Sequence, residues 1–262
     1  MKHHLQVFRA AVRMTIWDYL AQPMWPFWLT ITPFAFALVA VFLYRDAPPK
    51  TFALYVVLGS GAMGMWASAL GGCSFSMMQE RRWGTIVYTF TTPASQLWIA
   101  AGRSLVHAVI GLMTLAEIAL ISVLFLGIQL TIASPVAFLL AVLLTILAFA
   151  VIGLFLNSFF MLTRSASDWQ NALSRFLYVF CGVMYPISVL PDWLRPFSYV
   201  LAPTWSLKAI RLSVEPGALG NSDYLMNIGL TLLLTMVYLL LAWYLQGVTE
   251  HKLRISAELE RI

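Results

Sequence analysis

Long uncharged runs separated by short charged stretches dominate the pattern of this 262-residue chain. A helix needs about 20 apolar residues to cross a bilayer. Runs of that length lie between residues 18 and 45, 50 and 80, 103 and 164, 169 and 190, and 223 and 250. The third run is long enough for two spans divided by a turn at 127–135. Because lipid offers no partner to backbone polar groups, we predict an all-α integral membrane protein with six transmembrane helices.

Two segments do not fit this series of transmembrane helices. In residues 1–22, polar and apolar residues occupy different helical faces, with Lys2, Gln6, Arg9 and Arg13 on one and Phe8, Val12 and Tyr19 on the other. This pattern is typical of an amphipathic helix lying in the membrane interface. Residues 185–211 are rich in Pro and Trp, too apolar for a free loop and too broken for a span. We predict short re-entrant helices there, between spans five and six.

Composition supports a membrane protein and argues against several other classes. The chain is 61% hydrophobic and 10% charged, whereas a soluble domain keeps about 25% charged residues. The net charge of +5 and the lack of a Lys/Arg block argue against nucleic-acid binding. The two cysteines, Cys73 and Cys181, stand alone in apolar runs and predict neither a disulfide nor a metal site.

The distribution of Lys and Arg predicts that both termini are cytoplasmic. Of the 16 basic residues, eleven then lie inside: Lys2, Arg9, Arg13, Arg81, Arg82, Arg103, Arg164, Arg175, Lys252, Arg254 and Arg261. Five lie outside: Arg45, Lys50, Arg195, Lys208 and Arg211. The opposite orientation would reverse this bias.

The loop after the second span, residues 79–98, reads QERRWGTIVYTFTTPASQLW. A charged cluster leaves the span, Gly84 permits a break, and a short helical stretch ends at Pro93. A compact segment held by two long helices is suited to docking into a groove of another protein and transmitting force. An ordinary basic anchor at the inner membrane surface fits the composition equally well.

Two stretches resemble the membrane subunits of ABC-2 type exporters. ERRWGTI at 80–86, followed by Thr-Pro at 92–93, resembles the coupling segment of that family. YPIS at 185–188 and LPDWL at 190–194, followed by Pro203 and Arg211, resemble its external signature. The resemblance covers nearly the whole chain, including the order of interfacial helix, six spans, coupling helix and re-entrant helices.

This resemblance implies a single ABC-2 type transmembrane domain over 1–262 in the bacterial inner membrane. It implies a transport subunit, not an enzyme, that works with two copies of an ABC ATPase and with a second identical or related permease. The ATPase-coupling residues that it implies are Glu80, Arg81, Arg82, Gly84 and Thr85. Val87 departs from the Glu that is common in the family, which predicts a weakened or rearranged docking contact.

The chain lacks a phosphate-binding loop of its own. Such a loop ends in Gly-Lys-Ser/Thr, and none of the lysines, at positions 2, 50, 208 and 252, follows a glycine. We therefore expect this chain to bind no cofactor and ATP to be bound by the partner subunit.

Several residues within the predicted spans invite more than one interpretation. A carboxylate near the bilayer centre, such as Glu117, costs about 2.5–3.5 kcal/mol on insertion scales. It either lines a substrate path or proton site, or joins helices as a protonated or hydrogen-bonded group. His107 is interpreted as headgroup-level packing. The four-residue spacing of Gly64, Ser68 and Gly72 predicts close helix packing, within the subunit or between subunits.

Two other functional classes compete with an ABC permease. A membrane enzyme would need clustered catalytic side chains, which the spans lack. An ion-driven secondary transporter would be expected to show repeated halves and paired intramembrane charges, neither of which is evident, and it is the main rival. The scarcity of polar groups in the spans favours an amphipathic or lipid-like substrate over a small ion.

Overall fold

The computed structural model describes residues 2–48, 52–69, 80, 83–84, 94–127, 132–161, 172, 180–182 and 187–255. Within these residues, all regular secondary structure is helical. The long helices are α1 (Lys2–Ala21), α2 (Trp25–Tyr44), α6 (Gln96–Leu126), α7 (Pro135–Met161) and α11 (Ser222–Ile255). The short ones are η1 (Leu54–Gly59), η2 (Ile187–Val189), α9 (Arg195–Val200), α10 (Ala202–Ser213) and η3 (Ala218–Gly220).

Three helices are long and apolar enough to cross a membrane: Gln96–Leu124, Pro135–Phe160 and Ser222–Glu250. Two shorter apolar helices, Pro33–Tyr44 and Leu54–Ala69, accompany them. The two helices are separated where the sequence predicts, since α6 ends at Leu126 and α7 begins at Pro135. The predicted fifth span lies mostly outside the described residues, so the number of six spans stays a prediction.

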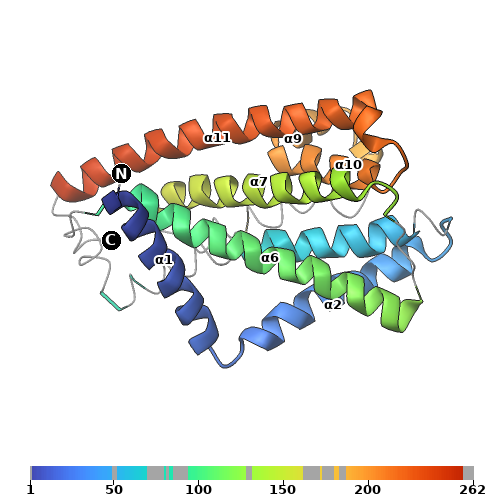
Figure 1. Ribbon diagram of the computed structural model, residues 1–262, viewed down its shortest axis with the longest axis horizontal. Coiled ribbons are helices and arrows are strands. Elements are labelled where there is room, and N and C mark those ends of the chain that lie inside the picture. Colours follow the sequence, from blue (N-terminus) through green and yellow to red (C-terminus); the bar gives the residue numbers. More distant parts are fainter. Residues whose placement is uncertain are drawn as a thin grey trace.

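Helices α6, α7 and α11 run side by side along the long axis of the molecule (Figure 1). Buried residues make up 61% of the α7 span but 22% of the α11 span, which makes α7 the central helix and α11 a peripheral one. Trp66 and Phe149 meet edge to face in the core, with ring centroids 5.5 Å apart. Helix α11 therefore offers most of its apolar surface to the surroundings of the chain.

Helix α1 crosses the bundle at an angle and packs against α6 (Figure 1). Its buried side consists of Ala11 and Thr15, whereas Arg9, Arg13 and Trp17 are exposed. The structure has a helix over Lys2–Ala21, within the predicted 1–22, with small residues facing α6 and large or charged ones facing outward. Its place in the membrane interface stays a prediction.

Glycines allow α6 and the helix over 52–69 to approach closely. A Cβ atom on Gly64 would lie 2.3 Å from Thr114 Oγ1 and 3.2 Å from Pro33 Cγ. A Cβ atom on Gly111 would lie 2.7 Å from the Cα atom of Met65. Gly64 thus packs within the subunit, against α6 and α2. Gly72, the last member of the predicted stripe, lies outside the described residues.

Short helices α9, α10 and η3 gather at one end of the bundle, opposite the beginning of α1 (Figure 1). Two bonds tie this end together: the Tyr224 hydroxyl donates to the Ala137 carbonyl at 2.8 Å, and the Ser134 hydroxyl donates to the Glu215 carbonyl at 2.9 Å. Pro203 stands in the first turn of α10, where a missing backbone N–H costs nothing. The short helices expected in 185–211 are present in its described part, and their re-entrant course remains a prediction.

Candidate functional site

An ion pair fixes residue 80 to α6. Helix α6 begins after the extended residue Ser95, and Arg103 follows two turns later. Its guanidinium Nη2 donates to the carboxylate Oε1 of Glu80. Each side chain is only 14% exposed, so water screens the pair less than it screens a surface pair. The predicted coupling residue Glu80 therefore serves as an anchor on α6.

Trp83 and Gly84 form an exposed turn three residues after Glu80. Trp83 is 69% exposed, and Gly84 has φ +67° with no neighbouring atom within 4 Å of a would-be Cβ. This left-handed conformation favours glycine over any residue with a side chain. An exposed indole on an anchored turn is suited to contact another protein. Arg81, Arg82 and Thr85 lie outside the described residues, and their coupling role stays a prediction.

The beginning of α1 contacts the beginning of α6. The His4 ring stacks on Trp98 with centroids 5.9 Å apart, and Phe8 meets the same indole edge to face at 6.3 Å. A Cβ atom on Gly102 would lie 3.0 Å from both Ala11 Cβ and the Phe8 carbonyl oxygen. Helix α6 is therefore the common support of α1 and of the turn at Trp83–Gly84.

Glu117 is half-buried on α6, and its Oε2 atom has no hydrogen-bond partner in the described part of the chain. Burial raises the pKa of the Tyr19 hydroxyl on α1, and the charge of the nearby Glu117 raises it further. His107 meets Tyr19 edge to face at 6.5 Å and buries its Nε2 atom. The Glu117 carboxylate is therefore close to α1 as well as to the neighbouring residues of its own helix.

One face of α6 carries a polar stripe that the sequence interpretation missed. Arg103, His107, Thr114 and Glu117 follow one another at intervals of four, seven and three residues, which place them on one side of a helix. Thr114 Oγ1 donates to the Gly111 carbonyl at 2.6 Å. The regular helical spacing of these residues in the sequence is the signal that indicates the stripe. The stripe runs from the ion pair with Glu80 toward the other end of the bundle.

A second group of cations and aromatic rings lies on α10. The Lys208 ammonium is 4.3 Å from the centre of the Trp205 ring and 5.3 Å from that of Tyr199, at cation–π distance. The Arg211 guanidinium is 4.5 Å from the centre of the Tyr55 ring and donates to the Gly182 carbonyl at 3.1 Å. Arg211 belongs to the external signature in the sequence, which does not indicate these partners. The three-residue steps from 205 to 211 were the signal for a shared helical face.

These features define a multi-pass membrane protein, built from apolar helices, with an anchored and exposed turn at one end. The family model described as ABC-2 type transporter matches residues 6–214, from α1 through α10. The match covers most of the chain, which therefore belongs to the ABC-2 type transporter family. No curated protein matches the sequence.

Membership settles the general class of activity. The chain is a permease component of a transporter, a type of subunit that transports and is not itself catalytic. Permeases of this family generally work with an ABC ATPase partner. The resemblance identified from residues 80–86 and 185–211 is thereby confirmed at the level of the family.

Proposed function

We propose that this chain is the permease of an ABC exporter that moves an amphipathic or lipid-like substrate out of the cytoplasm. A separate ATPase subunit binds ATP and supplies the energy. The observation that carries the proposal is the exposed turn at Trp83–Gly84, attached to α6 through the ion pair of Glu80 with Arg103. An ATPase that binds this turn can move α6 without contacting any part of the bundle core.

The ion pair gives the coupling step a mechanical basis. Closure of the ATPase pair around ATP displaces the turn, together with the flanking residues Arg81, Arg82 and Thr85. Because Glu80 is bonded to Arg103, the displacement is passed to α6 at a point two turns inside the helix. Helix α6 also contacts α1 and α7, so these helices move with it. Val87 replaces an acidic contact of the family with an apolar one.

The proposed topology has six spans with both termini in the cytoplasm of a bacterium, and the bilayer is its inner membrane. Two observations support it. The described helices place the start of α1 and the end of α11 at the same end of the bundle (Figure 1), as an even number of crossings requires. The beginning of α6, which carries Arg103 and its partner Glu80, lies at that end as well (Figure 1), and the bias of eleven basic residues against five favours a cytoplasmic location for it.

The proposed complex contains two permeases and two ATPase subunits. One permease supplies a single docking turn, whereas an ABC ATPase pair offers two equivalent positions. Exposed apolar residues along α11, such as Leu233, Met236 and Leu240, leave area for lipid and for a second identical or related permease. The substrate leaves between the two permeases, and Glu117 lines its path.

The first experiment identifies the partner. The tagged full-length chain is solubilised in mild detergent from its own host, and copurifying proteins are identified by mass spectrometry. An ABC ATPase in stoichiometric amount supports the proposal. Reproducible recovery of the chain alone rejects it.

A matched pair of variants then tests the docking turn. Gly84 and Gly127 both have positive φ and open surroundings, and Gly127 caps α6 at its far end. We expect Gly84→Trp to abolish copurification of the ATPase and transport-coupled ATP hydrolysis, whereas Gly127→Trp leaves both near the wild-type level. Equal behaviour of the two variants would reject Gly84 as part of the docking site.

An ion-driven secondary transporter is the alternative function, favoured by the buried Glu117 Oε2 atom without a partner in the described residues. In that case transport in proteoliposomes would proceed without ATPase and would collapse when a protonophore removes the proton gradient. Under the ABC proposal, transport requires ATP and tolerates the protonophore.

A further inference from the structure

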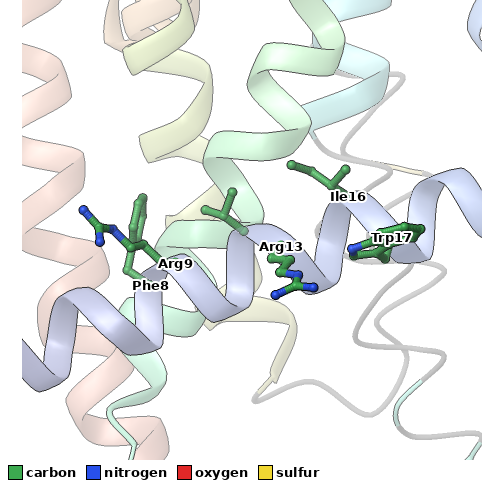
Figure 2. A pocket seen from close by; sticks show the side chains of 6 residues that line it. Phe8, Arg9, Arg13, Ile16 and Trp17 are labelled. Carbon is green, nitrogen blue, oxygen red and sulfur yellow. The ribbon is translucent and has the colours of Figure 1, made fainter.

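A groove of about 250 Å³ lies on α1, lined by Phe8, Arg9, Val12, Arg13, Ile16 and Trp17. Figure 2 shows that all the lining side chains project from this single helix. The groove is therefore open along its length. An elongated molecule fits it better than a compact one.

Two arginines give the groove a positive charge. Arg9 and Arg13 are four residues apart, so they lie on neighbouring turns of one face. Both are exposed, and neither forms an ion pair within the described part of the chain. Asp18, the acid on α1, follows Arg9 by nine residues, which places it on the opposite side of the helix. The groove thus complements an anion.

The groove lies near the end of α6 at which its apolar span begins. Ala11 and Phe8 contact α6 at Gly102, six residues into the apolar span that begins at Gln96. At 1.5 Å per residue, this is about 9 Å inside the span. Ile16 and Trp17 are 43% and 63% exposed beside the arginines. Apolar side chains and cations therefore meet at one level, as in helices that lie in the membrane interface.

We propose that this groove binds an anionic phospholipid of the leaflet next to the coupling turn. The headgroup phosphate lies between Arg9 and Arg13, and one acyl chain follows Phe8, Val12 and Ile16. Guanidinium groups suit this role because they bind phosphate oxygens through two parallel N–H donors. This proposal requires only that the chain is a membrane protein, which its family establishes. It does not depend on the direction or the substrate of transport.

The bound lipid would hold α1 against the beginning of α6. Phe8 lines the groove and also contacts Trp98, five residues before Arg103, the partner of Glu80. A lipid that fixes Phe8 therefore also restricts the beginning of α6, to which the coupling turn is attached. Anionic lipid is thus a structural ligand of the coupling end.

The test measures lipid preference directly. The full-length chain is reconstituted in nanodiscs of equal parts phosphatidylglycerol and phosphatidylcholine, and lipids retained after detergent extraction are counted by native mass spectrometry. Each basic residue near an anionic surface strengthens association by about fivefold. We expect Arg9→Gln and Arg13→Gln to lower the preference for phosphatidylglycerol by about fivefold each, and the double variant to lose more than about tenfold.

The matched control is Arg45→Gln, which removes an exposed arginine from the end of α2, away from the groove, and should leave the preference unchanged. The single variants keep the test usable if the double variant does not fold. A preference that is unchanged in R9Q and R13Q, or equally reduced in R45Q, overturns the proposal. So does displacement of the lipid by millimolar inorganic phosphate, which would indicate a site for small anions. Loss of a copurifying protein with unchanged lipid preference would indicate an acidic protein surface instead.

Discussion

The Arg103 guanidinium of α6 is bonded to the Glu80 carboxylate across 23 residues of sequence, and both side chains are 14% exposed. The intervening segment contains the exposed Trp83 and the left-handed Gly84. The ion pair therefore attaches Glu80 to the bundle, whereas Trp83 and Gly84 form an exposed turn. This division decides how each residue of the loop is expected to respond to substitution.

Exchange of the two charges separates anchoring from docking. Glu80→Arg alone places two like charges together, and Arg103→Glu does the same with the opposite sign. Breaking a buried pair costs about 3–5 kcal/mol, and the residual exposure puts the expected loss near the lower limit. We expect each single variant to lose ATPase stimulation and the double exchange to regain most of it.

The measurement is ATP hydrolysis by the complex in proteoliposomes, with thermal stability recorded alongside. If Glu80 instead contacts the ATPase directly, the double exchange restores stability and leaves stimulation absent. Trp83→Ala is the companion variant, expected to weaken ATPase docking without a loss of thermal stability because its side chain is exposed.

Gly64→Ala should destabilise the chain. Its new Cβ atom would lie 2.3 Å from Thr114 Oγ1 and 2.7 Å from Thr114 Cβ, so the two helices must separate. Overpacking of this kind costs about 1–3 kcal/mol. The control is Gly229→Ala on α11, where no atom lies within 4 Å and removal of a helical glycine favours folding by up to about 1 kcal/mol. Thermal unfolding in one detergent compares the two, and an equal shift would contradict the packing assigned to Gly64.

Glu117→Gln tests the proposed substrate path. The amide keeps the size of the side chain and removes its ability to ionise. We expect normal assembly and thermal stability with a several-fold lower transport rate. Glu117→Leu is the comparison: it should stabilise the helix bundle, because a polar group with an unpartnered oxygen is replaced by an apolar one. A transport rate that both variants leave unchanged would assign Glu117 to helix packing.

The pKa of the Lys208 ammonium is lowered by burial and, to a smaller extent, by the charge of Arg211. In the unfolded chain the group holds its proton up to the ordinary pKa of 10.5. As pH rises through the interval below that value, the folded chain loses the proton first, and the contribution of Lys208 to stability rises with pH. Amine acylation as a function of pH, read at Lys208 by mass spectrometry, should give a lower midpoint in the folded than in the denatured chain. Coincident midpoints would contradict the burial.

Some ends of the long helices were predictable, because the reason for each lies in nearby residues. The start of α6 was not, since the apolar run predicted a span from residue 103 and the helix begins at Gln96. The break between Leu126 and Pro135 and the helix beginning at Ser222 follow the apolar runs, and the helix at the N-terminus follows its amphipathic pattern. In lipid, an apolar run of sufficient length has no alternative to the helix. The family was predictable for the same reason, since its signatures at 80–86 and 185–194 are continuous stretches of sequence.

The partners of the polar residues were not predictable in this way. Glu80 was expected among the ATPase-coupling residues, and the structure adds an ion pair with Arg103 that the sequence does not indicate. The coupling role of Glu80 stays a prediction. The small-residue stripe was consistent with contacts inside the subunit or between subunits, and the approach of Gly64 to Thr114 and Pro33 places Gly64 inside the subunit.

The sequence by itself determined the class of the protein, the positions of its long helices and its family. Each of these depends on the solvent, because the bilayer imposes a length and a composition on every segment that crosses it. Only the tertiary structure decided which side of each helix meets which neighbour. It brought Arg103 to Glu80, Tyr19 to His107, and the groove of α1 to the outside of the bundle. Those contacts depend on the rotation of each helix about its axis and on close packing. Composition does not determine either one when nearly every face of a helix is apolar.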